Sequence, residues 1–111
     1  ADLSHQGLLD DEAFARAWSN ERQALKPRSR RLVRKELKDK GIAPEVAERV
    51  TEDIDDDAVA LELARRRAET MANVDQTAFL RRLSGYLYNR GFSHSSVARA
   101  LGRLGHERDV S

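Results

Sequence analysis

Basic residues recur at helical spacing along one stretch of the chain and are the first candidates for binding chemistry. Arg30, Arg34 and Lys38 stand at positions i, i+4 and i+8 and fall on one face of a helix. Like charges on one face repel each other, and binding to a phosphate backbone or to an acidic groove on a partner would relieve this repulsion. The alternative is a solvated face balanced by nearby acidic residues. The first candidate surface comprises Arg28, Arg30, Arg31, Arg34, Lys35 and Lys38.

A second basic cluster follows in the other half of the chain. Arg65, Arg66 and Arg67 are consecutive, and consecutive residues fan around a helix by about 100° each, so the three do not share a face. We expect at least one of them to lie along the interior edge by its aliphatic stem. Arg81 and Arg82 in the next helix are expected to extend this patch. The second candidate surface comprises Arg65, Arg66, Arg81 and Arg82.

Acidic, histidine and aromatic residues give weaker signals. Asp55, Asp56 and Asp57 precede a helix without the glycine and later glutamate of a calcium loop, so we expect one of them to cap that helix. The three histidines are scattered, and no glycine-rich phosphate loop or nucleophile elbow is present. We expect Tyr86 to pack between the two repeats and Tyr88 to be exposed. The sequence therefore predicts no metal, no cofactor, no catalytic residues and no enzyme activity.

These residues must be positioned by helices, and one helical pattern occurs twice. Leu37 and Gly41 recur 50 positions later as Leu87 and Gly91, each pair followed by an apolar residue and a short helix. Self-similarity at such a period is typical of a repeated supersecondary unit, and repeats present extended binding surfaces. The prediction is an all-α fold of six helices in two tandem three-helix repeats. Counting from Gly41 to Val46 and from Gly91 to Val97 predicts a loop one residue longer in the second repeat.

Capping and breaking residues predict where the elements begin and end. Gly7 is expected to end an earlier element, Asp10 or Asp11 to begin the first helix, and Gly105 to end the last. Phe14 and Trp18 are expected in the core. The domains predicted are a stub of a preceding repeat at residues 1–6, repeats at 7–54 and 55–105, and a tail at 106–111.

Composition agrees with a small binding protein. The 111 residues are 40% hydrophobic and 35% charged, and only 5% are aromatic. The formal net charge of +1 conceals a segregation, since residues 26–40 hold eight basic and two acidic residues, while residues 45–62 hold eight acidic and one basic. The absence of cysteine and of any apolar run of about 20 residues favours a cytoplasmic protein without a membrane span.

The stretch from Gly7 to Trp18 resembles the RecX family of RecA regulators. So do Lys26-Pro27, the Arg-rich helix that closes as Glu36-Leu37-x-x-x-Gly41-Ile42, and Leu87-x-x-Arg90-Gly91-Phe92-Ser93. The resemblance covers residues 6–104 and implies tandem three-helix repeats, normally three, of which this chain matches the second and third while the first is expected to be absent.

The resemblance also implies a function. The family binds the RecA recombinase and its nucleoprotein filament on single-stranded DNA and modulates or inhibits ATP hydrolysis, strand exchange and filament growth. A monomer with weak single- or double-stranded DNA binding is expected. Two alternatives stay open, namely a helix-turn-helix-like DNA-binding module and a structural helical-repeat adaptor. The first is disfavoured because the basic helix is the middle one and the helix after it is acidic.

Overall fold

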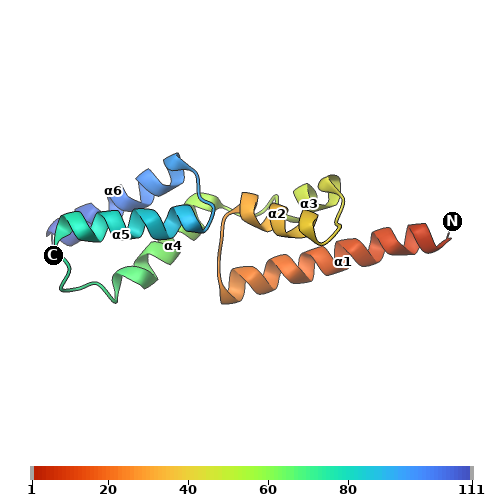
Figure 1. Cartoon of the computed structure of the whole chain (residues 1–111), viewed down its shortest axis with the longest axis horizontal. Helices are drawn as coiled ribbons and strands as arrows, with labels where there is room; N and C mark the ends of the chain where they lie inside the picture. Colours follow the sequence, from red (N-terminus) through yellow and green to blue (C-terminus); the bar gives the residue numbers. More distant parts are fainter. Residues whose placement is uncertain (1, 111) are drawn as a thin grey trace. The chain divides into compact units, whose positions relative to one another are not determined.

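The described part of the chain contains six helices and no strand. The computed structural model describes the backbone of residues 2–110 and the side chains of residues 11–109. The helices are α1 (Asp2–Leu25), α2 (Arg30–Asp39), α3 (Pro44–Val50), α4 (Asp56–Ala68), α5 (Gln76–Asn89) and α6 (His94–Val110) (Figure 1). The chain divides after Ile54 into two compact units, each containing three helices, and the all-α repeat prediction is confirmed.

Local signals determine where most helices begin. The Ser29 hydroxyl accepts a hydrogen bond from the Leu32 amide, and the carboxylates of Asp55 and Asp75 accept from the amides of residues 58 and 78. Ser93 caps α6 in the same way, through the amide of residue 96. Pro44 occupies the first turn of α3, where its missing N–H costs nothing. The expectation that one of the three aspartates at 55–57 caps the following helix is confirmed by Asp55.

The two middle helices end in the same motif. Gly41 and Gly91 adopt φ of +86° and +88°, a left-handed conformation that glycine reaches without strain. The next amide bonds back to the leucine five residues earlier, at 3.0 Å for Ile42 to the Leu37 carbonyl and at 3.3 Å for the equivalent pair in the second unit. This is the Schellman arrangement, and it explains why Leu-x-x-x-Gly and a following buried apolar residue recur together.

The register of the repeat differs from the prediction in the third helix. Both α3 and α6 begin three residues after their glycine, so the two loops have equal length. The buried pair Val46 and Ala47 therefore corresponds to Ser96 and Val97, both of which are buried. The prediction of a loop one residue longer in the second repeat is wrong, because the equivalent of Val46 is Ser96 and not Val97. A serine can occupy this buried position because its hydroxyl is hydrogen-bonded.

The first unit has a core of small and aliphatic side chains from all three helices, namely Ala15, Val33, Leu37, Ile42, Val46, Ala47, Val50 and Ile54. Helix α1 contributes to it through Ala15 and the buried Ser19. Phe14, in contrast, is 45% exposed and Trp18 is half-buried, so the expectation that Phe14 belongs to the core is wrong. Small residues on α1 set the buried face and leave the aromatic side chains at its edge.

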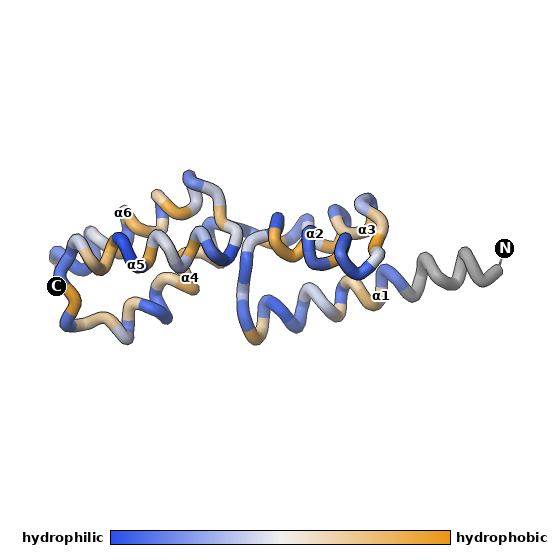
Figure 2. The backbone as a smooth tube through the Cα atoms, viewed as in Figure 1, coloured by the Kyte–Doolittle hydropathy of each residue, from blue (hydrophilic) through white to orange (hydrophobic). Residues whose placement is uncertain are grey.

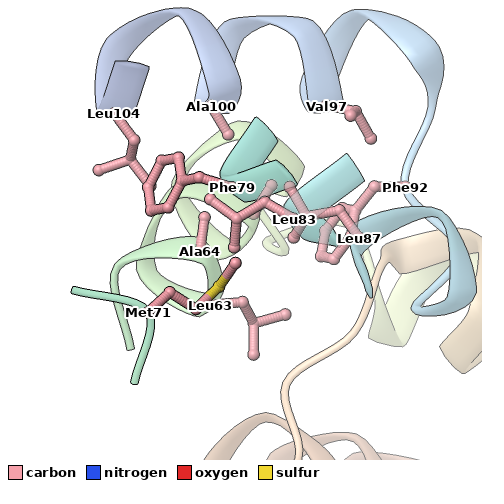
Figure 3. Close-up of a cluster of buried hydrophobic side chains, with 11 residues drawn as sticks. Leu63, Ala64, Met71, Phe79, Leu83, Leu87, Phe92, Val97, Ala100 and Leu104 are labelled. Carbon is pink, nitrogen blue, oxygen red and sulfur yellow. The ribbon is translucent and has the colours of Figure 1, made fainter. Parts of the chain in front are cut away.

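The second unit has a larger core in which aromatic residues take part. Phe79, Leu83 and Leu87 of α5 point toward Leu63 and Ala64 of α4, and α6 closes the cluster with Val97, Ala100 and Leu104 (Figure 3). Leu61, Leu80 and Leu101 are only half-buried and pack at the edge of this cluster. Apolar positions recur along each helix with hydrophilic residues between them (Figure 2).

Two glycines do not end helices as predicted. Helix α1 runs from Asp2 through Gly7, so neither Asp10 nor Asp11 begins it. Helix α6 continues through Gly105 to Val110. Gly105 is buried inside α6 beside Leu80 of α5, and the helix passes through it without ending.

Candidate partner-binding surface

The candidate basic residues of the first unit lie on or next to α2. Ser29 caps this helix, and Val33 and Leu37 are fully buried, which fixes the rotation of α2 against its unit. The basic side chains occupy the remaining positions. Their environments fall into two groups, one bonded within the unit and one directed to solvent.

Arg30 and Arg34 are half-buried and hold the end of α3. Nη2 of Arg30 donates to the Ile54 carbonyl at 2.6 Å and to the Glu52 carbonyl at 3.2 Å. Nε of Arg34 donates to Oγ1 of Thr51 at 2.8 Å, and this fully buried hydroxyl donates in turn to a carbonyl of α3. The end of a helix leaves carbonyls without partners, and cations stabilise it. The expectation of one exposed ridge is therefore wrong for these two arginines.

Arg28 is also engaged within the first unit. Its Nη1 forms an ion pair with the Glu36 carboxylate, with only 12% and 22% of the two side chains exposed, and its Nε donates to a backbone carbonyl. The other oxygen of Glu36 accepts from Nε1 of Trp18 at 3.1 Å. Glu36 therefore links α2 to α1 through Trp18, and Arg28, which pairs with the same carboxylate, has little contact with solvent.

Three basic residues remain on the exposed side of α2, and we call Arg31, Lys35 and Lys38 the α2 face. Lys35 pairs with Asp39 at 3.1 Å, but both side chains are about two-thirds exposed, so the pair is worth at most about 0.5 kcal/mol. Within the described residues, Arg31 and Lys38 have no ion pair. This face holds the positive charge that is available to a partner.

The middle helix of the second unit also presents exposed basic residues, and we call Arg81 and Arg82 the α5 face. Arg81 stands 50 positions after Arg31, is exposed, and like its neighbour Arg82 has no ion pair within the described residues. Tyr88 stands 50 positions after Lys38 and is 43% exposed, as predicted, with its hydroxyl 2.8 Å from Nδ1 of His94. The repeat therefore presents an arginine at the same place in each unit.

The arginines of α4 are committed to partners within the second unit. Arg65 makes two hydrogen bonds to the Glu107 carboxylate, at 2.8 and 2.9 Å, and these hold the pKa of Glu107 below its ordinary value. Arg66 pairs with Glu62 at 2.5 Å, and the Arg67 guanidinium lies 5.3 Å from the centre of the Tyr86 ring. All three arginines are exposed, so the expectation that one lies along the interior edge is wrong.

Acidic residues of the second unit make hydrogen bonds within the fold. Asp55 caps α4, and Asp57 accepts hydrogen bonds from the Ser96 hydroxyl at 2.7 Å and from Arg99 at 2.6 Å. These bonds lower the pKa of Asp57. Among the side chains that the structure describes, no three histidine, cysteine or acidic residues gather as metal ligands would.

Sequence reasoning missed a cation–aromatic contact in each unit. The Arg22 guanidinium and the Lys40 ammonium lie 4.1 and 4.3 Å from the centre of the Trp18 ring. Tyr86 has corresponding neighbours in Arg67 and Arg90. The i, i+4 spacing of Trp18 and Arg22 was visible in the sequence, as was a cation before each left-handed glycine, but the contact of Lys40 with α1 depends on tertiary packing.

Comparisons with known proteins agree with the repeat architecture. Residues 10–50 match the family model described as RecX, second three-helix domain, and residues 55–101 match RecX, third three-helix domain. No solved structure matches the chain. No helix in the described residues is long and apolar enough to cross a membrane.

Curated relatives carry the name "Regulatory protein RecX". The chain is 36% identical to the protein of Amycolatopsis mediterranei over 81% of this chain and 53% of the relative. It is 35% identical to the protein of Mycobacterium avium over 96% of this chain and 65% of the relative. It is 32% identical to the protein of Prosthecochloris aestuarii over 92% of this chain and 67% of the relative. The chain spans about half the length of the Amycolatopsis relative and about two thirds of the other two. With both family models matched in tandem, the chain belongs to the RecX family.

Proposed function

We propose that this chain binds the RecA recombinase and its nucleoprotein filament on single-stranded DNA, and that binding inhibits ATP hydrolysis, strand exchange and filament growth. Membership of a family whose curated members are named regulatory proteins supports this proposal. The chain acts by binding as a cytoplasmic regulator and performs no catalysis of its own.

The observation that carries the proposal is the charge left on the middle helices. Of the ten candidate residues, those without an ion pair in the described part of the chain and with exposed side chains are Arg31 and Lys38 on the α2 face and Arg81 and Arg82 on the α5 face. Lys35 retains most of its exposure beside them. Because each unit offers basic residues on its middle helix, the chain can engage two neighbouring acidic or phosphate-bearing sites along a repeating partner.

Arg28, Arg30 and Arg34 take a different role in this proposal. They stabilise the first unit and position the α2 face without contacting the partner. Arg65 and Arg66 similarly brace α4 through Glu107 and Glu62. Changes at these residues act through folding, whereas changes at the α2 face act on binding.

The test compares two charge-reversed variants in a RecA ATPase titration on single-stranded DNA. Arg31→Glu combined with Lys38→Glu removes the exposed charge of the α2 face, and Arg16→Glu combined with Arg103→Glu makes the same change in net charge at exposed positions elsewhere. The first variant is expected to lose inhibition, and the control to keep it. Equal inhibition by both variants contradicts the proposed surface. Steeply salt-dependent duplex binding by the chain alone, without any effect on RecA, would instead favour a DNA-binding module.

A further inference from the structure

An apolar strip runs along α1 of the first unit. At 100° per residue, positions 14, 18 and 25 fall within an arc of roughly 40°, on the edge of the face that packs into the unit. Phe14 is 45% exposed and Leu25 is 67% exposed, and Trp18 lies half-buried between them. These three residues, together with Arg22 and Lys40, are called the α1 strip below.

Positive charge borders the Trp18 ring closely. The Arg22 guanidinium and the Lys40 ammonium lie 4.1 and 4.3 Å from its centre, and the Phe14 ring stacks beside it at 6.2 Å with an interplanar angle of 24°. The hydrogen bond from Nε1 to Glu36 fixes the orientation of the indole. Because the ring is already crowded by two cations and a phenyl group, it leaves little free face for a nucleobase.

The second unit covers more of the apolar surface at the equivalent positions of α4. Aligning the buried pair Ala15 and Ser19 of α1 with the buried pair Ala60 and Ala64 of α4 places Val59 at the position of Phe14 and Leu63 at that of Trp18. Leu63 is only 3% exposed, and Val59 is half-buried and packs against the core of its unit. The repeat architecture therefore does not require an exposed apolar strip, and the exposure is specific to the first unit.

We propose that the α1 strip binds an acidic peptide segment of a partner protein that carries apolar side chains between its carboxylates. The apolar side chains cover Phe14 and Leu25, and the carboxylates pair with Arg22 and Lys40, whose charge is complementary. Tryptophan, arginine and aromatic groups are the residue types that dominate the energy of protein interfaces. This surface is separate from the α2 face and does not rest on the identity of the partner proposed above.

The strip also sets the length of the segment. From residue 14 to residue 25 the helix rises by about 16 Å, which about five residues of extended chain would span. A synthetic peptide of about ten residues in which leucine or phenylalanine alternates with aspartate is therefore a suitable probe. Two matched peptides serve as references, one with lysine in place of aspartate and one with serine in place of the apolar residues.

Trp18 is the only tryptophan of the chain, so its fluorescence reports on this strip alone. Titration with the acidic apolar peptide is expected to change the Trp18 emission saturably and to raise the anisotropy of a labelled peptide. Phe14→Ala, Leu25→Ser and Arg22→Gln are each expected to weaken binding about tenfold or more, as a residue at the centre of an interface does. Tyr88→Ala, which removes an exposed aromatic of the second unit, is the matched control and is expected to bind normally.

Several results would overturn the proposal. They are equal binding of the lysine peptide, binding unaffected by the three strip substitutions, and no binding of the acidic apolar peptide by a chain whose circular dichroism shows it folded. If oligothymidylate binds and the same substitutions abolish that binding, the strip is a nucleic-acid surface. If sedimentation shows a dimer that Phe14→Ala dissociates, the strip is covered by a second copy. Neither result bears on RecA inhibition through the α2 face, which the ATPase titration tests separately.

Discussion

Arg30 and Arg31 are adjacent arginines on one helix, and their substitution by alanine is predicted to have opposite consequences. Arg30 donates to the carbonyls of Ile54 and Glu52, whereas Arg31 points to solvent. Arg30→Ala is expected to destabilise the first unit and Arg31→Ala to leave its stability unchanged. In a binding assay the order reverses, since Arg31 belongs to the α2 face.

The magnitude is calculated from the two hydrogen bonds that Arg30 donates to these carbonyls. A hydrogen bond from a charged donor contributes about 1.5–3 kcal/mol, and the bond at 3.2 Å to the more exposed carbonyl contributes less than the one at 2.6 Å. We expect Arg30→Ala to lower the free energy of unfolding by about 2 kcal/mol in total. A unit of this size has a total stability of about 3–8 kcal/mol, and at about 4–8 °C per kcal/mol its Tm should fall by roughly 8–16 °C. An exposed substitution such as Arg31→Ala stays within about 0.5 kcal/mol.

Trp18 makes the assay specific to the first unit. Trp18 is the only tryptophan of the chain and lies in the first unit, so thermal and urea unfolding followed by its fluorescence report on that unit. Far-ultraviolet circular dichroism of the same samples records both units together. If Arg31→Ala destabilises the unit as much as Arg30→Ala, or if Arg30→Ala has no effect, the division between structural and surface arginines is refuted.

Three further predictions concern the fold. Gly41→Ala is expected to lower the free energy of unfolding by about 1–2 kcal/mol, because φ is +86° at this position and the substitution adds only backbone strain. Gly85→Ala is expected to raise it by up to about 1 kcal/mol, because Gly85 lies inside α5 and its Cβ would meet open space. Urea titrations of both variants test these opposite signs. Leu83→Ala removes a fully buried side chain of the second core and is expected to cost about 2–5 kcal/mol in the same titrations, a value below 1 kcal/mol being incompatible with the packing described. Hydrogen bonds from Ser96 and Arg99 lower the pKa of Asp57, so the stability that these bonds contribute is present above the ordinary pKa of 3.8 and is lost as the pH falls through the lower folded pKa. Asp57→Asn should therefore flatten the pH dependence of the Tm below about pH 4. An unchanged slope would count against this hydrogen-bond network.

Much of the fold could be predicted because its signals are local. Ser29 and Asp75 cap the helix that follows them, and Gly41 and Gly91 stop a helix by their own backbone conformation. The repeat strengthened the prediction, because a leucine, a glycine and a following apolar residue occur at the same spacing in both units. The expectation that Gly105 ends the last helix is wrong because a glycine inside a helix looks the same in sequence as a glycine at a helix end.

The candidate surface could be predicted only in part. Helical periodicity identified a basic helix but not which of its arginines reach back to the unit. That depends on the end of α3, where Glu52, Thr51 and Ile54 offer oxygens to Arg30 and Arg34. A long side chain at the border of the buried face can turn either way, and only the tertiary neighbours decide.

The most direct test of the proposed function is the rate of RecA ATP hydrolysis on single-stranded DNA as this chain is added, with the Arg31→Glu, Lys38→Glu variant beside it. We expect the unmodified chain to suppress ATP hydrolysis and the variant, equally folded, to leave it unchanged. Suppression of equal depth by both would contradict the assignment of the α2 face, and no suppression by the folded unmodified chain would contradict the proposal that these two repeats inhibit RecA.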